Sequence, residues 1–215
     1  LSDGATRFSS LLDGALHALV ADHVVQGRIT FPGAGYLELA RAAAFSAVAS
    51  PTGAALNGVF FLQPLAVEEG LVIECVIADG RFEVRSGDAD DDALAADAAV
   101  HCSGSFAPNA RGVWQHADQA LTRGSLSACA VDVGALYDGF DAIGLQYGPG
   151  YRTIVQAWGG EAATARLRVR STQQGTQVHP ADLDDALKIS TFIASSASDG
   201  DGKTRLPFAV EAAQL

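Results

Sequence analysis

The feature that most constrains this chain is a pair of apolar helical segments, each introduced by a proline. The first, predicted over residues 34–49, follows Pro32 and is apolar on nearly every side. The second, predicted over residues 181–194, follows Pro180. Proline suits the first turn of a helix, where its missing N–H costs nothing. Because a helix that is apolar all round has to be buried, we expect a sheet wrapped around each one.

The segments between these helices supply the strands. Alternating or β-branched runs predict strands over residues 24–31, 56–62, 71–78, 81–85, 95–106, 153–158 and 164–169. A short helix is expected over 133–140, followed by a Gly/Pro turn at 144–150. The polar segment 107–130 is the best candidate for a linker. The second half thus repeats the architecture of the first without repeating its sequence.

Composition narrows the classes of partner. The 215 residues are 48% hydrophobic and carry a net charge of -11. Acidic surfaces repel nucleic acids and anionic membranes, so neither is expected as a partner. No apolar run reaches the ~18 residues that a membrane helix needs. An acidic protein partner would have to be held close in another way, such as covalent tethering.

The three cysteines, Cys75, Cys102 and Cys129, lack the spacing of a metal site. We expect buried, reduced thiols and a cytoplasmic location. The chain starts at Leu1 without a signal-peptide pattern and contains no methionine, which predicts a piece of a longer protein.

His23 is the first candidate for chemistry. A lone histidine among apolar residues is usually part of a core, but this one stands just before a turn that ends at Pro32. The helix that starts there has backbone N–H groups without intrahelical partners, which can hold a carbonyl oxygen. An imidazole beside such donors suits removal of a proton alpha to a carbonyl.

Asp184 is the second candidate. Asp182 and Asp185 stand beside it at a helix start, where capping and dipole compensation are their ordinary roles. A carboxyl in an apolar cavity tends to keep its proton, which would let Asp184 act as an acid. Lys188 follows four residues later on the same helix face. An ion pair between the two would favour the carboxylate and oppose an acid role.

Other signals are weaker. Tyr147 and Gly148 form an ordinary turn with Pro149, although in a cleft the phenol would be a neutral hydrogen-bond donor. Residues 33–35 lack the third glycine of a dinucleotide fingerprint. The acidic runs do not match a calcium loop, and no serine stands in a G-x-S-x-G elbow.

These motifs together resemble the dehydratase domain of modular polyketide synthases. Residues 23–32 match its H-x3-G-x4-P motif in full, and residues 179–184 its H-P-x-x-L-D segment. Residues 144–151 resemble G-Y-x-Y-G-P-x-F with Leu145 and Tyr151 substituted. Residues 206–210 resemble L-P-F-x-W with Val210 in place of tryptophan. The four motifs occur in the family's order over residues 10–215.

The resemblance implies an α+β double hotdog, in which two units each wrap an antiparallel sheet around a central helix. We expect residues 1–115 to carry His23 and residues 116–215 to carry Asp184 in an apparently truncated second unit, together forming one dehydratase domain. The implied substrate is a β-hydroxyacyl chain on the phosphopantetheine of an acyl carrier protein. The implied partners are that carrier and other synthase domains, with a homodimer left open. No bound cofactor or metal is implied.

The resemblance also implies roles for residues. His23 would remove the alpha proton, and Asp184 would protonate the leaving β-hydroxyl. The Gly33 N–H would hold the thioester carbonyl. The other substrate-binding positions would be Tyr147, which positions the hydroxyl, together with Pro32, Gly148 and Lys188.

Lys188 departs from the family, which usually has glutamine or histidine there. It would either hold Asp184 ionised or donate to the departing oxygen itself. Two alternatives therefore stay open at this point. One is an isomerase or oxygen-heterocycle-forming cyclase on the same fold. The other is a catalytically degenerate scaffold that binds carrier-bound chains, which Lys188 and Val210 favour.

Overall fold

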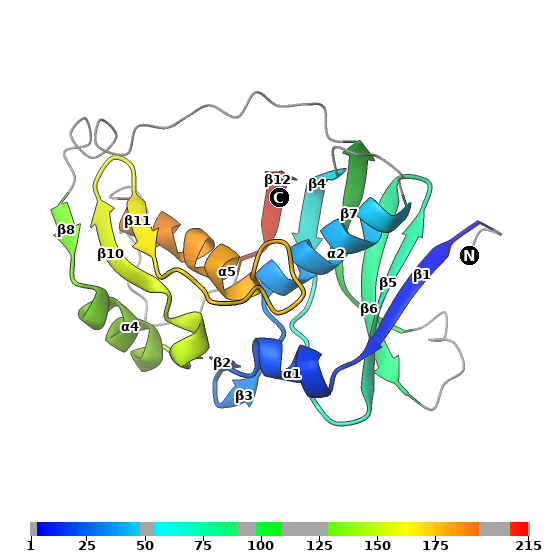
Figure 1. Cartoon of the computed structure of the whole chain (residues 1–215), viewed down its shortest axis with the longest axis horizontal. Helices are drawn as coiled ribbons and strands as arrows, with labels where there is room; N and C mark the ends of the chain where they lie inside the picture. Colours follow the sequence, from blue (N-terminus) through cyan, green and yellow to red (C-terminus); the bar gives the residue numbers. More distant parts are fainter. Residues whose placement is uncertain (1–3, 48–53, 90–97, 109–128, 194–206, 215) are drawn as a thin grey trace.

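Two groups of strands lie on either side of two central helices in the computed structural model, which describes residues 4–47, 54–89, 98–108, 129–193 and 207–214. The helices are α2 (Gly33–Ala47) and α5 (Pro180–Lys188), and they run roughly end to end between the two groups (Figure 1). Both helices start where their prolines predict, and they contact each other. This contact brings Gly33, at the start of α2, close to the helix that carries Asp184.

The larger sheet has six antiparallel strands in the order β1-β5-β6-β7-β4-β12. Their bounds are Thr6–Leu11, Leu71–Ala78, Arg81–Asp88, Ala99–Pro108, Ala54–Phe61 and Ala209–Gln214. Strands β5 and β6 are joined by Asp79 and Gly80, which both have positive φ, as a two-residue hairpin turn requires. Helix α2 packs on this sheet and buries Leu37 with Leu56 and Phe82 in the main core.

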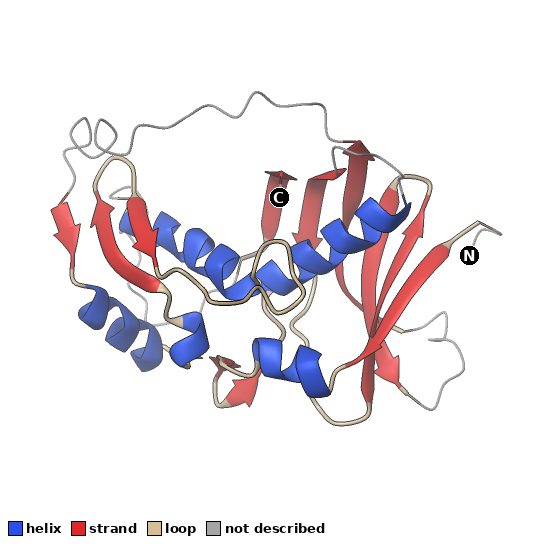
Figure 2. Ribbon diagram, in the orientation of Figure 1, coloured by secondary structure: helices blue, strands red, loops and turns tan. Residues whose placement is uncertain are grey.

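The smaller group contains a sheet of β8 (Cys129–Val131), β10 (Ile154–Gly159) and β11 (Thr164–Leu167), in the order β11-β10-β8. Helix α4 (Val133–Ala142) begins at Asp132, whose side chain accepts a hydrogen bond from the Ala135 N–H. The 3-10 helices η1 (Pro149–Tyr151) and η2 (Ile189–Phe192) complete this half. Figure 2 shows that α4 and α5 belong to this side of the molecule.

A third, small sheet joins the two halves. It pairs β2 (His23–Val25) with β3 (Arg28–Ile29) on one side and with β9 (Leu145–Tyr147) on the other, and the helix α1 (Gly14–Val20) precedes it. His23 stands directly opposite Tyr147 in this pairing. The Asp22 carbonyl accepts from the Gly148 N–H at 2.8 Å, and the Asp22 carboxylate accepts from the Gly150 N–H at 2.6 Å. Backbone pairing therefore carries His23 to the second half of the chain.

Several predicted elements differ from the structure. The single strand expected over 24–31 is the β2–β3 hairpin, because Gln26 and Gly27 both have positive φ and turn the chain. The turn expected over 144–150 contains β9, which is too short to give an alternating pattern. The helix expected over 181–194 is α-helical only to Lys188 and then tightens into η2.

The end of the chain also departs from expectation. Residues 209–214, which fall in the range expected to form the second unit, make a strand, β12, that pairs with β4 and extends the larger sheet. The predicted boundary between the two units, at residues 115 and 116, lies outside the described residues and stays a prediction. The same holds for most of the predicted linker, residues 107–130. All three cysteines are free, and Cys129 is exposed rather than buried because it begins β8, at the edge of its sheet.

No helix in the part of the chain that the structure describes has the length and apolarity needed to cross a membrane.

The joining sheet leads to a stability prediction at Gly148. A Cβ added there would lie 2.3 Å from Asp22 Oδ1 and 2.9 Å from Asp22 Cβ, so Gly148→Ala would force Asp22 away from its hydrogen bonds. We expect a loss of about 1–3 kcal/mol in the free energy of unfolding, measured by urea denaturation. The matched control is Gly139→Ala in α4, where an added Cβ meets nothing within 4 Å. That change should stabilise the chain by up to ~1 kcal/mol, and equal stability of the two variants would contradict the prediction.

Candidate active site

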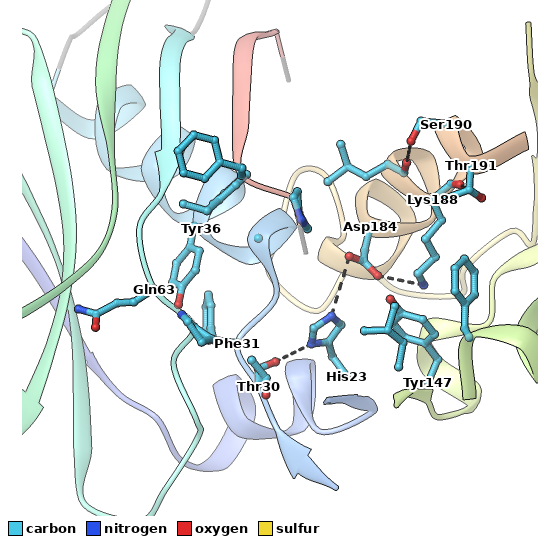
Figure 3. A pocket seen from close by; sticks show the side chains of 18 of the residues that line it. His23, Thr30, Phe31, Tyr36, Gln63, Tyr147, Asp184, Lys188, Ser190 and Thr191 are labelled. Atoms are coloured by element: carbon cyan, nitrogen blue, oxygen red, sulfur yellow. Dashed lines mark hydrogen bonds and ion pairs between the residues drawn. The ribbon is translucent and has the colours of Figure 1, made fainter. Parts of the chain in front are cut away.

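The two halves enclose one cavity of about 460 Å³. Its walls are mainly apolar and aromatic and include Phe31, Tyr36 and Phe61 from the first half and Phe140 and Leu187 from the second. Among its polar side chains, His23, Asp184, Lys188 and Tyr147 lie close together, as Figure 3 shows. A largely apolar cavity with a few converging polar groups is the usual form of a small-molecule site.

His23 is buried at the start of β2, with its ring directed at the cavity (Figure 3). Its Nδ1 lies 2.6 Å from the Thr30 carbonyl oxygen. Because a carbonyl can only accept, Nδ1 carries the hydrogen, and in the neutral ring Nε2 has the free lone pair. Burial lowers the pKa of His23 below 6.5, although the nearby Asp184 partly opposes this effect. The ring is therefore poised as a base.

Asp184 faces His23 from the second turn of α5. Its Oδ1 lies 4.0 Å from His23 Nε2, and its Oδ2 lies 2.9 Å from Lys188 Nζ. The second contact is an ion pair, and Oδ2 receives no hydrogen bond from the described residues. Asp184 is buried, and its side chain lines the cavity. The predicted approach of His23 and Asp184 is thus found in the structure.

Lys188 is buried among several partners. Its Nζ donates to Asp185 Oδ1 at 2.7 Å and to the Tyr151 carbonyl at 3.3 Å. It also lies 3.3 Å from the centroid of the Tyr147 ring, a cation–π contact. The i,i+4 ion pair with Asp184 that the spacing predicts is present.

Tyr147 presents a neutral phenol to the cavity. It lies in β9 beside His23, with ring centroids 5.6 Å apart. Burial raises the pKa of Tyr147, and the nearby carboxylates of Asp184 and Asp185 raise it further. The phenol therefore keeps its proton and can donate it in a hydrogen bond.

The predicted site residues do not all reach the cavity. His23, Asp184, Tyr147 and Lys188 line it, and so does Gly33 at the start of α2, together with Thr30 and Pro207. Pro32 is fully buried immediately before α2, and its carbonyl accepts from the Gly35 N–H at 2.8 Å. Gly148 lines a separate shallow hollow. Its contact with Asp22 makes it part of the joining sheet.

Asp185 is a site residue that sequence reasoning missed. It was assigned to capping, but the cap of α5 is His179, whose Nδ1 accepts from the Ala181 N–H. Asp185 is instead fully buried and accepts from both the N–H and the hydroxyl of Thr153 and from Tyr137. The one available signal was its i,i+3 spacing to Lys188.

Comparison with known proteins identifies the family. A model of the polyketide synthase dehydratase domain matches residues 1–86. A second model, described as the polyketide synthase dehydratase N-terminal domain, matches residues 117–215. The chain belongs to the polyketide synthase dehydratase family.

Individual relatives agree. The chain is 35% identical over 217 residues to polyketide synthase ThaG of Burkholderia thailandensis. The match covers 92% of this chain and 4% of the length of ThaG. The dehydratase domain from the CurF module of curacin polyketide synthase superposes with a TM-score of 0.82 at 24% identity, covering 98% of this chain and 78% of that one. The corresponding CurK domain gives 0.83 at 23% identity, covering 98% and 77%. The fold is the double hotdog, as predicted.

The burial of His23 predicts how stability depends on pH. Its folded pKa is below the value of about 6.5 in the unfolded chain, so the unfolded state binds the proton more readily. The free energy of unfolding should therefore fall as the pH drops below about 6.5, by up to ~1.4 kcal/mol per pH unit for this group. Burial lowers the pKa of His101 and His179 too, so they add to the slope.

The measurement is urea denaturation of wild type and His23→Asn between about pH 7.5 and 5. Asparagine can still donate to the Thr30 carbonyl but does not titrate. The variant should lose less stability over this range, and an identical slope in both proteins would contradict the assignment.

Proposed function

We propose that this chain dehydrates a β-hydroxyacyl thioester to an α,β-unsaturated thioester, a hydro-lyase reaction within a polyketide synthase. The observation that carries the proposal is the approach of His23 Nε2 to Asp184 Oδ1 across the cavity, at 4.0 Å. Elimination of water needs a base at the alpha carbon and an acid at the β-oxygen. A neutral imidazole and a carboxyl facing each other are groups of the required types.

The proposed reaction has two proton transfers. His23 Nε2 takes the alpha proton, and the electron pair of that C–H bond forms the new double bond as the bond from the β-carbon to oxygen breaks. The leaving hydroxyl takes a proton from Asp184 and departs as water. The Gly33 N–H, at the start of α2, binds the thioester oxygen as negative charge develops on it. Return of the proton from His23 to Asp184 restores the resting state.

Two more residues bind the departing oxygen in this proposal. Lys188 Nζ lies 2.9 Å from Asp184 Oδ2. A substrate β-hydroxyl bound to Asp184 would therefore also lie close to the Lys188 ammonium. In this proposal the neutral Tyr147 phenol, at the end of β9, donates to the same hydroxyl. An ammonium and a phenol beside the leaving group stabilise the charge that develops on it.

The relatives support this assignment. Two solved structures of the same fold are variants of the CurK dehydratase, one with a histidine replaced by phenylalanine and one with an aspartate replaced by asparagine, and both are described as inactive. We infer that His23 and Asp184 are the corresponding residues here, since both lie in the matching family motifs.

The net charge of the chain and its free cysteines support a proposal for how the substrate is delivered and where the protein works. We propose a substrate held on the phosphopantetheine of an acyl carrier protein in the same synthase, because a chain with net charge -11 gains its substrate by tethering rather than by attraction to an acidic carrier. The three free cysteines favour the cytoplasm.

The first test replaces the two catalytic residues. His23→Ala and Asp184→Asn should each lower kcat by at least about 100-fold while thermal unfolding stays cooperative, because each removes one proton transfer. The assay incubates the protein with carrier-bound β-hydroxyacyl substrates and detects loss of water by mass spectrometry. Asp182→Asn is the matched control, since Asp182 is on the same helix but pairs with Arg170 at 2.6 Å and does not line the cavity. Full activity in either catalytic variant would remove that residue from the mechanism.

The second test is the pH profile. The base must be neutral to act, and burial lowers the pKa of His23. In the wild type, kcat/KM should therefore stay level as the pH falls to about 6.5 and decline only below it. A decline that begins well above pH 6.5 would exclude His23 as the base.

A further inference from the structure

We propose that Asp185 is a positioning residue that takes up the charge of Lys188 and so leaves Asp184 able to give its proton to the departing hydroxyl. This inference rests on the dehydration proposed above and extends it to a residue that does not line the cavity. It concerns three consecutive contacts, from Asp185 to Lys188, from Lys188 to Asp184, and from Asp184 to His23.

Asp185 is fully buried and surrounded by hydrogen-bond donors. Its Oδ2 accepts from the Thr153 N–H at 2.8 Å and from the Thr153 hydroxyl. The Tyr137 hydroxyl lies 3.3 Å from Oδ1, and Lys188 Nζ lies 2.7 Å from the same oxygen. This fully buried carboxyl therefore receives four hydrogen-bond donors, one of them the Lys188 ammonium. Without Lys188, a charge on Asp185 would have no counter-ion at comparable distance among the described contacts.

Lys188 is bound by Asp185 more fully than by Asp184. Two of its three N–H bonds are used by Asp185 Oδ1 and the Tyr151 carbonyl. Its approach to Asp184 Oδ2 is an ion pair in which that oxygen receives no hydrogen bond. Asp184 therefore has a charged neighbour but lacks the hydrogen-bond donors that surround Asp185.

The charges around the cluster support this division. The titratable groups nearest to it are His23 from β2, Tyr147 from β9, Tyr151 from η1 and Tyr137 from α4. Further out, Arg152 lies over the Tyr137 ring at 5.4 Å, and Arg170 and Asp22 act on Tyr151. Burial raises the pKa of each tyrosine and lowers that of His23, so all four are neutral. Lys188 thus lies between Asp185, which has a full set of hydrogen-bond donors, and Asp184, which lacks them and is the proton donor in this proposal. If Asp185 lost its charge, Asp184 would become the sole anion beside Lys188 and would be held ionised.

The test is a double-mutant cycle on the wild-type assay. Asp185→Asn should lower kcat at least about tenfold with KM changed less than about twofold, because binding groups in the cavity are untouched. Adding Lys188→Gln to that variant should raise kcat again by about fivefold or more, because the ammonium that holds Asp184 ionised is gone. Asp182→Asn, which removes a charge from the same helix away from the cavity, is the control and should leave kcat unchanged.

Two results would overturn the proposal. One is an Asp185→Asn variant with wild-type kcat. The other is a double variant no more active than Asp185→Asn, which would give Asp185 a merely structural role. If wild type itself does not eliminate water, the proposed function fails first, so the two failures are distinguishable.

A milder variant covers the case in which Asp185→Asn does not fold. Tyr137→Phe removes one donor from Asp185 and keeps its charge and the aromatic packing. We expect a loss of about threefold in kcat that Lys188→Gln reverses. An unchanged kcat in Tyr137→Phe, or a loss that Lys188→Gln leaves in place, would then contradict the proposal.

Discussion

The pairing of β2 with β9 is the interaction on which the rest of the site depends. It sets His23, from the first half of the chain, opposite Tyr147 from the second, and Asp22 strengthens it through Gly148 and Gly150. The contact of α2 with α5 then brings Gly33 and Asp184 to the same cavity. Residues more than a hundred positions apart meet because backbone hydrogen bonds, rather than side chains alone, fix their elements.

Burial gives these residues their chemistry. An exposed histidine would be partly protonated near neutral pH, whereas burial lowers the pKa of His23 and the Thr30 carbonyl fixes its tautomer. The same burial keeps Tyr147 neutral as a donor. The cost is that every charge in the cavity requires a partner, and the Lys188–Asp185 pair meets that need.

Sequence reasoning found most of this arrangement but not its connections. The helices were predictable because Pro32 and Pro180 mark their starts, and the motifs around His23 and Asp184 are local. The hairpin at Gln26 and the strand β9 were missed because two or three residues carry no periodicity. Asp185 was read as a cap because its partners, Thr153 and Tyr137, are fixed only by tertiary packing. The pairing of β12 with β4 is likewise a long-range contact.

The most direct measurement is a crystal structure of the Asp184→Asn variant with a β-hydroxyacyl pantetheine thioester bound. The account predicts that the alpha carbon faces His23 Nε2 and that the β-hydroxyl lies between residue 184 and Lys188 Nζ. The carbonyl oxygen should accept from the Gly33 N–H. A thioester bound in the shallow hollow beside Asp22 and Arg152, or one whose alpha carbon faces away from His23, would contradict it.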